Sequence, residues 1–164
     1  MIRDARPAEL TAAGRLRVAA YQAGGHLSPS SEYAATLAGL GTAGDGQVLV
    51  AVQDDQILGT VMLQLWPHAG QVVTEPDEAE IRALAVAQDG QGRGIGRALL
   101  QAVIDRAVRH GIARLILCTQ PDMLAAQNLY QQAGFERLPE RDWSPGDGLT
   151  LLAYGLVLRG PPTR

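Results

Sequence analysis

Seven residues near the middle of the chain, Gln91-Gly92-Arg93-Gly94-Ile95-Gly96-Arg97, have the types and spacing needed to hold a phosphate. Glycine residues adopt positive φ without a steric penalty and let the backbone approach an anion. The pattern of a long amphipathic helix follows the run. The unpaired N–H groups and the dipole at the start of such a helix favour negative charge. The segment therefore predicts a loop that binds a phosphate-containing ligand, with Arg93 and Arg97 adding positive charge beside it.

Two familiar phosphate-binding motifs do not fit this run. A nucleotide P-loop requires Lys-Ser/Thr after its last glycine, whereas Arg97 and Ala98 follow Gly96. The dinucleotide fingerprint G-x-G-x-x-G also fails, because counting from Gly92 places Arg97 at the position of the last glycine. The missing Lys-Ser/Thr, together with the lack of an obvious carboxylate for Mg²⁺, argues against a nucleotide hydrolase.

The pattern that remains, Gln91-x-x-Gly94-x-Gly96, resembles the coenzyme A pyrophosphate loop of the GNAT superfamily of N-acetyltransferases. A second segment, Ala125 to Phe135, is similar to the A-x-x-L-Y-x-x-x-G-F segment of that family. The resemblance covers roughly residues 79–158, about half of the chain. It implies acetyl-CoA as the acyl donor and no metal. The loop residues implied to bind the cofactor are Gln91, Gly92, Arg93, Gly94, Ile95, Gly96 and Arg97.

The resemblance also implies contacts to the rest of the cofactor. The pantetheine arm would pair with the backbone of Leu84, Ala85 and Val86 where two strands diverge. In the family this strand has a bulge whose N–H faces the thioester oxygen, which by position would come from Leu84 or Ala85. Many relatives have an Asn seven residues before the tyrosine of the second segment, but this chain has Met123 there. Gln127 lies on the same helix face as the tyrosine and is expected to replace that contact.

Two residues are expected to do the chemistry of acyl transfer to an amine. The resemblance makes Tyr130 the general acid that protonates the leaving thiolate, since a phenol with a pKa of about 10 keeps its proton at neutral pH. The alternative for Tyr130 is a core residue of an amphipathic helix. Glu80, six residues before Val86, stands where several GNAT enzymes have a catalytic glutamate, and it is the expected general base. The alternative is an ordinary charged residue at the start of a strand.

Other residues are expected to contact the acceptor. Glu78 is an alternative base and a substrate-binding residue, because it lies two residues before Glu80 on the same strand face. Trp143 is expected to wall the acceptor site, although a tryptophan folded over the core is an equal alternative. The acidic residues Glu75, Asp77, Glu78 and Glu80 favour a positively charged amine as acceptor.

Composition limits the classes of function. The chain has 164 residues, 46% hydrophobic and 19% charged, which is ordinary for one globular domain over residues 1–164. The net charge of −3 without a basic run argues against nucleic acid as a partner. No apolar run is long enough to span a membrane, no signal peptide is visible at the start, and the single cysteine, Cys118, excludes an internal disulfide. A cytoplasmic protein is expected, and the family relationship adds a homodimer as an option.

Periodicity and turn residues predict the elements that must position these groups. Helices are expected over 7–22, after a cap at Ser30 or Ser31, over 94–110 and over 122–133. Strands are expected over 1–3, 47–53, 57–66, 80–86, 113–119, 135–138 and 149–158, with a turn at Asp54-Asp55. Residues 139–148 are expected to form a loop.

Alternating helices and strands predict an α/β fold. The resemblance makes it a GNAT-type mixed, mostly antiparallel central sheet with splayed parallel fourth and fifth strands and helices on both faces. The expected function is transfer of an acetyl group from acetyl-CoA to a primary amine of a small molecule or peptide, by direct attack in a ternary complex. A non-catalytic acyl-CoA-binding module and an acyltransferase that uses a longer acyl-CoA are the alternatives.

Overall fold

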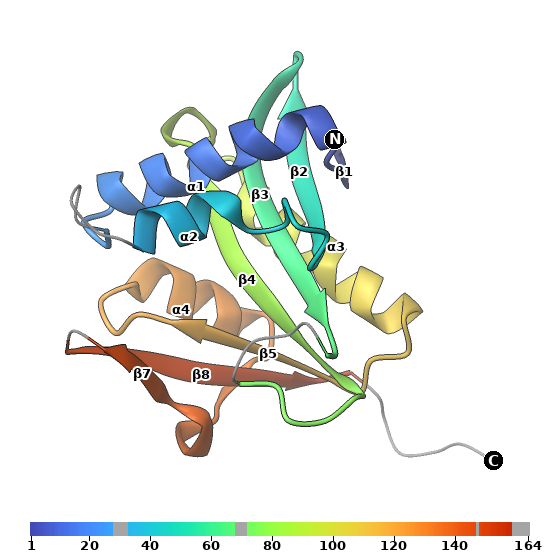
Figure 1. Ribbon diagram of the computed structural model, residues 1–164, viewed down its shortest axis with the longest axis vertical. Helices are drawn as coiled ribbons and strands as arrows, with labels where there is room; N and C mark the ends of the chain where they lie inside the picture. Colours follow the sequence, from blue (N-terminus) through green and yellow to red (C-terminus); the bar gives the residue numbers. More distant parts are fainter. Residues whose placement is uncertain (28–32, 68–71, 147, 159–164) are drawn as a thin grey trace. The chain divides into compact units, whose positions relative to one another are not determined.

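The computed structural model describes residues 1–27, 33–67, 72–146 and 148–158 (Figure 1). The chain forms two compact units. The first comprises residues 1–63 and 82–103, and the second comprises residues 64–81 and 104–164. The expected cap at Ser30 or Ser31 lies outside the described residues, and a single domain over 1–164 stays a prediction.

In the first unit, strands β1 (Ile2–Asp4), β2 (Gln47–Gln53) and β3 (Gln56–Leu65) form antiparallel pairs, and β4 (Glu78–Val86) follows β3 in the strand order. The turn between β2 and β3 is the predicted one. Asp54 and Asp55 both have positive φ, 51° and 62°, which is the geometry of the tight hairpin turn that matches the strand twist.

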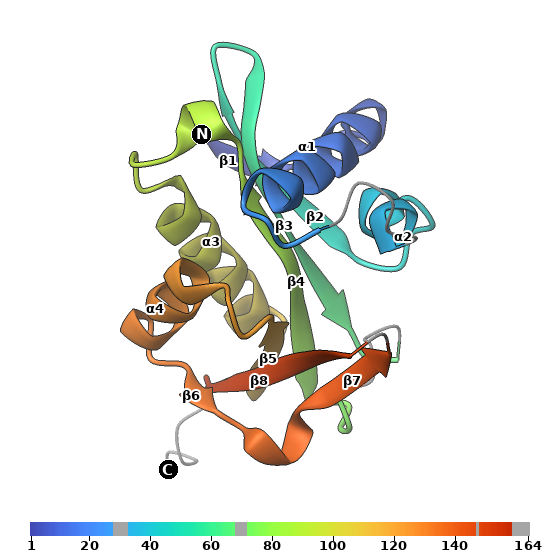
Figure 2. The same ribbon diagram turned by 90° about the vertical axis from the view of Figure 1, so that its left-hand side faces the viewer.

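Helices α1 (Leu10–Ala23) and α2 (Tyr33–Gly39) lie together on one side of β2 and β3 (Figure 2), and a short 3₁₀ turn, Pro7–Glu9, precedes α1. Gly14 lets the helices meet, because a Cβ there would collide with the carbonyl of Ala38. One turn later, Arg17 is fully buried and its Nη1 donates to the carbonyls of Leu37 and Leu40 at 3.2 and 2.9 Å. Arg17 therefore caps the C-terminal end of α2.

The N-terminal half of α3 (Ile95–Arg109) covers the opposite side of β3 (Figure 2). Gly59 of β3 allows this approach, since a Cβ there would lie 2.8 Å from Leu99 Cδ1. The amphipathic pattern of this helix predicts Val108 on its apolar side, and this prediction is wrong. Val108 is 55% exposed, and Ala107 is the buried residue instead. Gly111 ends the helix as predicted, with φ of 72°.

In the second unit, the first part of β4 pairs in parallel with β5 (Arg114–Thr119), and β5 pairs antiparallel with β8 (Leu149–Val157). Strand β6 (Glu136–Arg137) also pairs with β8. Helix α4 (Leu124–Gln132) follows β5, and Gly134 ends it with φ of 99°. The loop predicted over 139–148 is wrong in part, because it contains a 3₁₀ turn, Pro139–Arg141, and strand β7 (Trp143–Gly146), which pairs with β8.

The predicted fold class is confirmed. The sheet has eight strands, and the register of the described residues makes β4–β5 its parallel pair. None of the helices in the described part of the chain is long and apolar enough to cross a membrane.

Candidate active site

The predicted phosphate loop has the backbone geometry of an anion-binding turn. Gly92 and Gly94 adopt φ of 77° and 75°, and nothing lies within 4 Å of the position where a Cβ would stand at either residue. Within the described residues, the backbone hydrogen bonds outside helices and strands include none donated in good geometry by the N–H groups of residues 92–96. The first helical bond recorded here joins Ala98 N to Gly94 O at 3.0 Å. The loop and the start of α3 therefore offer several unpaired donors around one open space.

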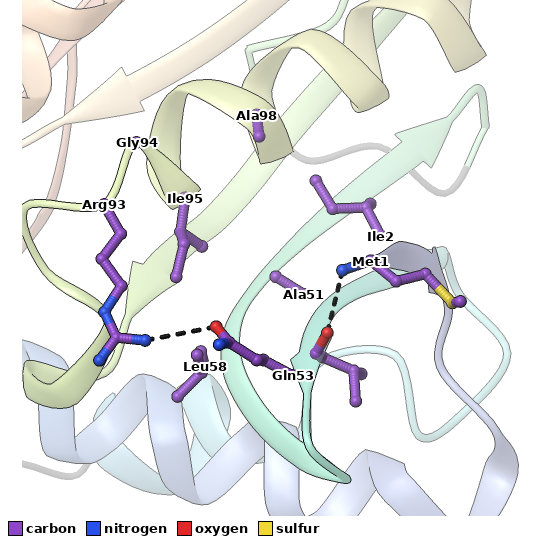
Figure 3. A pocket seen from close by; sticks show the side chains of 10 residues that line it. Met1, Ile2, Ala51, Gln53, Leu58, Arg93, Gly94, Ile95 and Ala98 are labelled. Carbon is purple, nitrogen blue, oxygen red and sulfur yellow. Dashed lines mark hydrogen bonds between the residues drawn. The ribbon is translucent and has the colours of Figure 1, made fainter.

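Arg93 is held beside the loop, where its Nη1 donates to Gln53 Oε1 at 3.3 Å (Figure 3). Next to this pair a cavity of about 370 Å³ opens between the start of α3 and strands β1–β3. Its walls are Met1, Ile2, Ala51, Val52, Gln53, Leu58, Arg93, Gly94, Ile95 and Ala98. None of Leu84, Ala85 and Val86 lines it, so the cavity is separate from the strand segment expected to hold the pantetheine arm.

Strand β4 has the irregularity that the resemblance implies. Its parallel ladder with β5 comprises four residue pairs, from Glu78↔Arg114 to Ile81↔Leu117. Two residues later, Ala83 adopts φ of 57°, a left-handed conformation that is uncommon for alanine and typical of a bulge. Leu84, Ala85 and Val86 follow this point, beyond the recorded ladder.

The two candidate bases have different surroundings in the second unit. Glu80 is 7% exposed and lies opposite Ile116 in the parallel ladder. Glu78 is 4% exposed, and Arg141 binds its carboxylate with both terminal nitrogens, at 2.8 and 2.9 Å. Arg114 Nε lies 3.2 Å from Glu78 Oε2 as an ion pair, although not in hydrogen-bond geometry, and the Thr74 N–H donates to Oε1 at 3.1 Å.

These partners hold Glu78 ionised. Burial acts against the charged form, but the hydrogen bonds from Arg141 and Thr74 and the charges of Arg141 and Arg114 together lower the pKa of Glu78 below its ordinary value. A carboxylate whose lone pairs are taken by arginine is a weak base and is not open to an amine. Base and substrate-binding roles for Glu78 stay predictions, and in this structure its carboxylate is occupied.

Tyr130 is placed on the buried side of α4, where it is 6% exposed. Its ring packs against Phe135 and Tyr154, with ring centroids 5.9 and 6.4 Å away. Tyr154 is a residue that sequence reasoning missed. Its hydroxyl donates to Gln127 Oε1 at 3.1 Å and accepts from Gln131 Nε2 at 3.4 Å.

The side chain of Gln127 already has partners. Its Nε2 donates to the carbonyls of Gln120 and Pro121, both at 3.0 Å, and its Oε1 accepts from Tyr154. Binding a cofactor through this amide would require one of those bonds to break. The expected replacement of the family's asparagine by Gln127 stays a prediction.

Trp143 begins β7 and packs with Val72, Val73 and Ile116. Its Nε1–H is buried and has no hydrogen-bond partner among the described residues.

An ion pair just before strand β7 is a second one that sequence reasoning missed. Both terminal nitrogens of Arg137 bind the carboxylate of Asp142, at 2.7 and 2.8 Å, and Asp142 also accepts from Ala153 N at 2.7 Å.

The predicted residues are thus brought together in two sets. The loop and Leu84–Val86 belong to the first unit, whereas Glu78, Glu80, Gln127, Tyr130 and Trp143 belong to the second. Among the described residues, no group of three or more His, Cys, Asp or Glu side chains could hold a metal ion.

Comparison of the sequence with known proteins identifies a family and several relatives. Residues 15–135 match the model of the acetyltransferase (GNAT) family. A mycothiol acetyltransferase from Kocuria rhizophila is 36% identical over 89 residues, 54% of this chain, and the match spans 28% of that protein's length.

Two solved structures share the fold over nearly the whole chain. The ribosomal-protein-S18-alanine N-acetyltransferase from Escherichia coli is 24% identical, with a TM-score of 0.72 over 100% of this chain and 98% of the other. A putative acetyltransferase from Salmonella typhimurium, solved with its cofactor acetyl-CoA, is 21% identical, with a TM-score of 0.70 over 100% of this chain and 96% of the other. With about three quarters of its length inside the family model, this chain belongs to the GNAT acetyltransferase family.

Proposed function

We propose that the protein transfers an acetyl group from acetyl-CoA to a primary amine, by direct attack in a ternary complex. One observation supports this most strongly. The loop of residues 92–96 gathers unpaired backbone N–H groups at the start of a 15-residue helix, which suits the pyrophosphate of coenzyme A. The structure of similar fold that contains acetyl-CoA supports the same donor.

The backbone of β4 would orient the donor. The recorded ladder with β5 ends at Ile81, and Ala83 adopts a left-handed conformation just before the segment 84–86. Leu84, Ala85 and Val86 would pair with the amides of the pantetheine arm, and the N–H of Leu84 or Ala85 would face the thioester oxygen. A donor aimed at that oxygen stabilises the negative charge that develops there during attack.

Glu80 and Tyr130 would move the two protons. When bound, acetyl-CoA supplies an electrophilic thioester carbonyl. The lone pair of the amine forms the new C–N bond and the C–S bond breaks. Glu80 takes the proton released from the amine nitrogen, directly or through a water, and Tyr130 gives its hydroxyl proton to the leaving sulfur. We do not assign this role to Glu78, because its carboxylate is paired with Arg141 and Arg114.

The acceptor is an amine whose class is open. The similar proteins described above include one named for mycothiol and one named for an alanine of a ribosomal protein. Trp143, which begins β7, would form part of the acceptor wall.

A thiol-release assay with acetyl-CoA tests the proposal across a panel of free amino acids, polyamines, aminoglycosides and peptides with different N-termini. We expect thiol release that requires one class of amine and yields an acetylated product by mass spectrometry. Glu80→Gln should lower kcat by about 10²-fold. Glu136→Gln is the matched control and should leave kcat unchanged, because Glu136 is exposed and lies outside the acidic stretch. Coenzyme A binding without amine-dependent thiol release would contradict the proposal.

A further inference from the structure

Tyr154 joins two points of α4 that lie one helical turn apart. Its hydroxyl contacts Gln127 at 3.1 Å and Gln131 at 3.4 Å, and these residues are four positions apart on one helix face. Tyr154 itself is 2% exposed and lies on β8, where Arg137 stands 5.5 Å from the centre of its ring. The phenol is therefore fixed by the sheet, and the helix is attached to it.

The direction of these bonds follows from the amide of Gln127. Its Nε2 donates to the carbonyls of Gln120 and Pro121, so its oxygen must face Tyr154. The single hydroxyl proton of Tyr154 then goes to Gln127, and Tyr154 accepts from Gln131. One chain of bonds thus runs from the second half of α4 through Tyr154 to the loop that enters α4.

Tyr130 stands between these two attachments. It follows Gln127 by three residues and precedes Gln131 by one, and its ring lies 6.4 Å from that of Tyr154, tilted by 51°. The start of α4 has no side-chain cap, since Met123 at that position makes no capping bond. The hydroxyl of Tyr154 therefore sets where this nine-residue helix, and Tyr130 with it, lies over the sheet.

We propose that Tyr154 is a positioning residue for proton transfer by Tyr130. The inference rests on the proposed function, in which Tyr130 protonates the leaving sulfur. Without the hydroxyl of Tyr154, Gln127 and Gln131 lose their common hydrogen-bond partner and α4 can shift. That shift would move the hydroxyl of Tyr130 away from the position at which it protonates the leaving sulfur. Proton transfer is sensitive to small displacements of the proton donor. The contacts of the cofactor with the glycine loop involve neither Tyr154 nor its two glutamine partners, so cofactor binding should not change.

The experiment is a kinetic double-mutant cycle with Tyr154→Phe, Tyr130→Phe and the double variant, measured with acetyl-CoA and the best amine of the panel. Tyr154→Phe keeps the ring and should lower kcat about tenfold, with the KM for acetyl-CoA unchanged within about twofold. In the Tyr130→Phe background the same change should lower kcat by less than about twofold. Gln131→Met should also lower kcat, because it removes one hydrogen bond to Tyr154. Gln131 is exposed, so this variant should fold normally.

Wild-type kcat in Tyr154→Phe would overturn the inference. It would also be overturned if the fold-losses in kcat of Tyr154→Phe and Tyr130→Phe multiply in the double variant, because independent residues behave in that way. Failure of the proposed function has a different signature. If Tyr130→Phe alone turns over at the wild-type rate, Tyr130 is not the acid, whatever Tyr154→Phe does.

Discussion

Replacing Glu78 by Gln should destabilise the protein strongly, because this carboxylate joins three segments of the second unit. Glu78 begins β4, Arg114 begins β5, and Arg141 belongs to the 3₁₀ turn before β7. The side chains of Glu78 and Arg141 are only 6% and 16% exposed, so water cannot readily replace the lost charge. In Glu78→Gln the guanidinium of Arg141 would remain buried without a counter-charge.

The size of the effect follows from the burial of the pair. Breaking a buried ion pair from one side costs about 3 kcal/mol or more. An unfolding entropy of about 2.1 cal/mol/K per residue gives about 0.34 kcal/mol/K for a chain of 164 residues. The midpoint of thermal unfolding should therefore fall by about 9 °C.

Thermal unfolding followed by circular dichroism measures this shift, with Glu75→Gln as the matched control. Glu75 is exposed and lies three residues earlier in the same acidic stretch, so its replacement should change the free energy of unfolding by less than about 0.5 kcal/mol. If Glu78→Gln unfolds within about 2 °C of Glu75→Gln, the ion pair does not stabilise the fold as argued.

Three further predictions concern the catalytic phenol, the helix crossing and acid stability. Tyr130→Phe should lower kcat about 10²-fold with little change in KM, and wild-type turnover under conditions where chemistry limits the rate would leave Tyr130 as packing only. Gly14→Ala should lower the free energy of unfolding by about 2 kcal/mol, because the added Cβ meets the Ala38 carbonyl. Gly39→Ala is the control and should be neutral or stabilising, because its Cβ would meet only Thr42 Oγ1 at 3.9 Å. Equal urea midpoints of the two variants would refute this prediction. The folded state lowers the pKa of Glu9 to about 2, and it lowers the pKa values of Glu78 and Asp142 below their ordinary values of 4.5 and 3.8. These ionised carboxylates therefore stabilise the fold at neutral pH, and the stabilisation should be lost as the pH falls from about 4.5 towards 2. A free energy of urea unfolding that is the same at pH 3 and at pH 7 would contradict this prediction.

Local sequence signals predicted most of the elements. The turn at Asp54-Asp55 and the helix ends at Gly111 and Gly134 depend on positive φ, and residues of these types tolerate it. Strand β7 was missed because its sequence, Trp-Ser-Pro-Gly, is poor in strand formers and mostly exposed. Only its pairing with β8 makes it a strand.

Side-chain partners far apart in sequence could not be predicted. The acidic stretch before β4 suggested one surface for a cationic acceptor, but Glu78 is neutralised by Arg141, 63 residues away. Likewise, the burial of Arg17 depends on carbonyls that only the packed pair of α1 and α2 presents, such as that of Leu40. The turn at Gly92 and Gly94 could be predicted because its positive φ values depend on glycine residues that lie close together in the sequence.

The central claim is that the glycine loop binds coenzyme A through its backbone. Calorimetric titration of coenzyme A into the wild type, Gly94→Val and Gly44→Val tests it most directly. Gly44 has φ of 72° and Gly94 has φ of 75°, and both have open space at the Cβ position, so valine introduces the same backbone strain at either site. Gly44→Val should bind like the wild type and Gly94→Val at least about tenfold more weakly, since only the second valine blocks the approach of the pyrophosphate. Equal affinities of the two folded variants, or no binding to the wild type, would contradict the account.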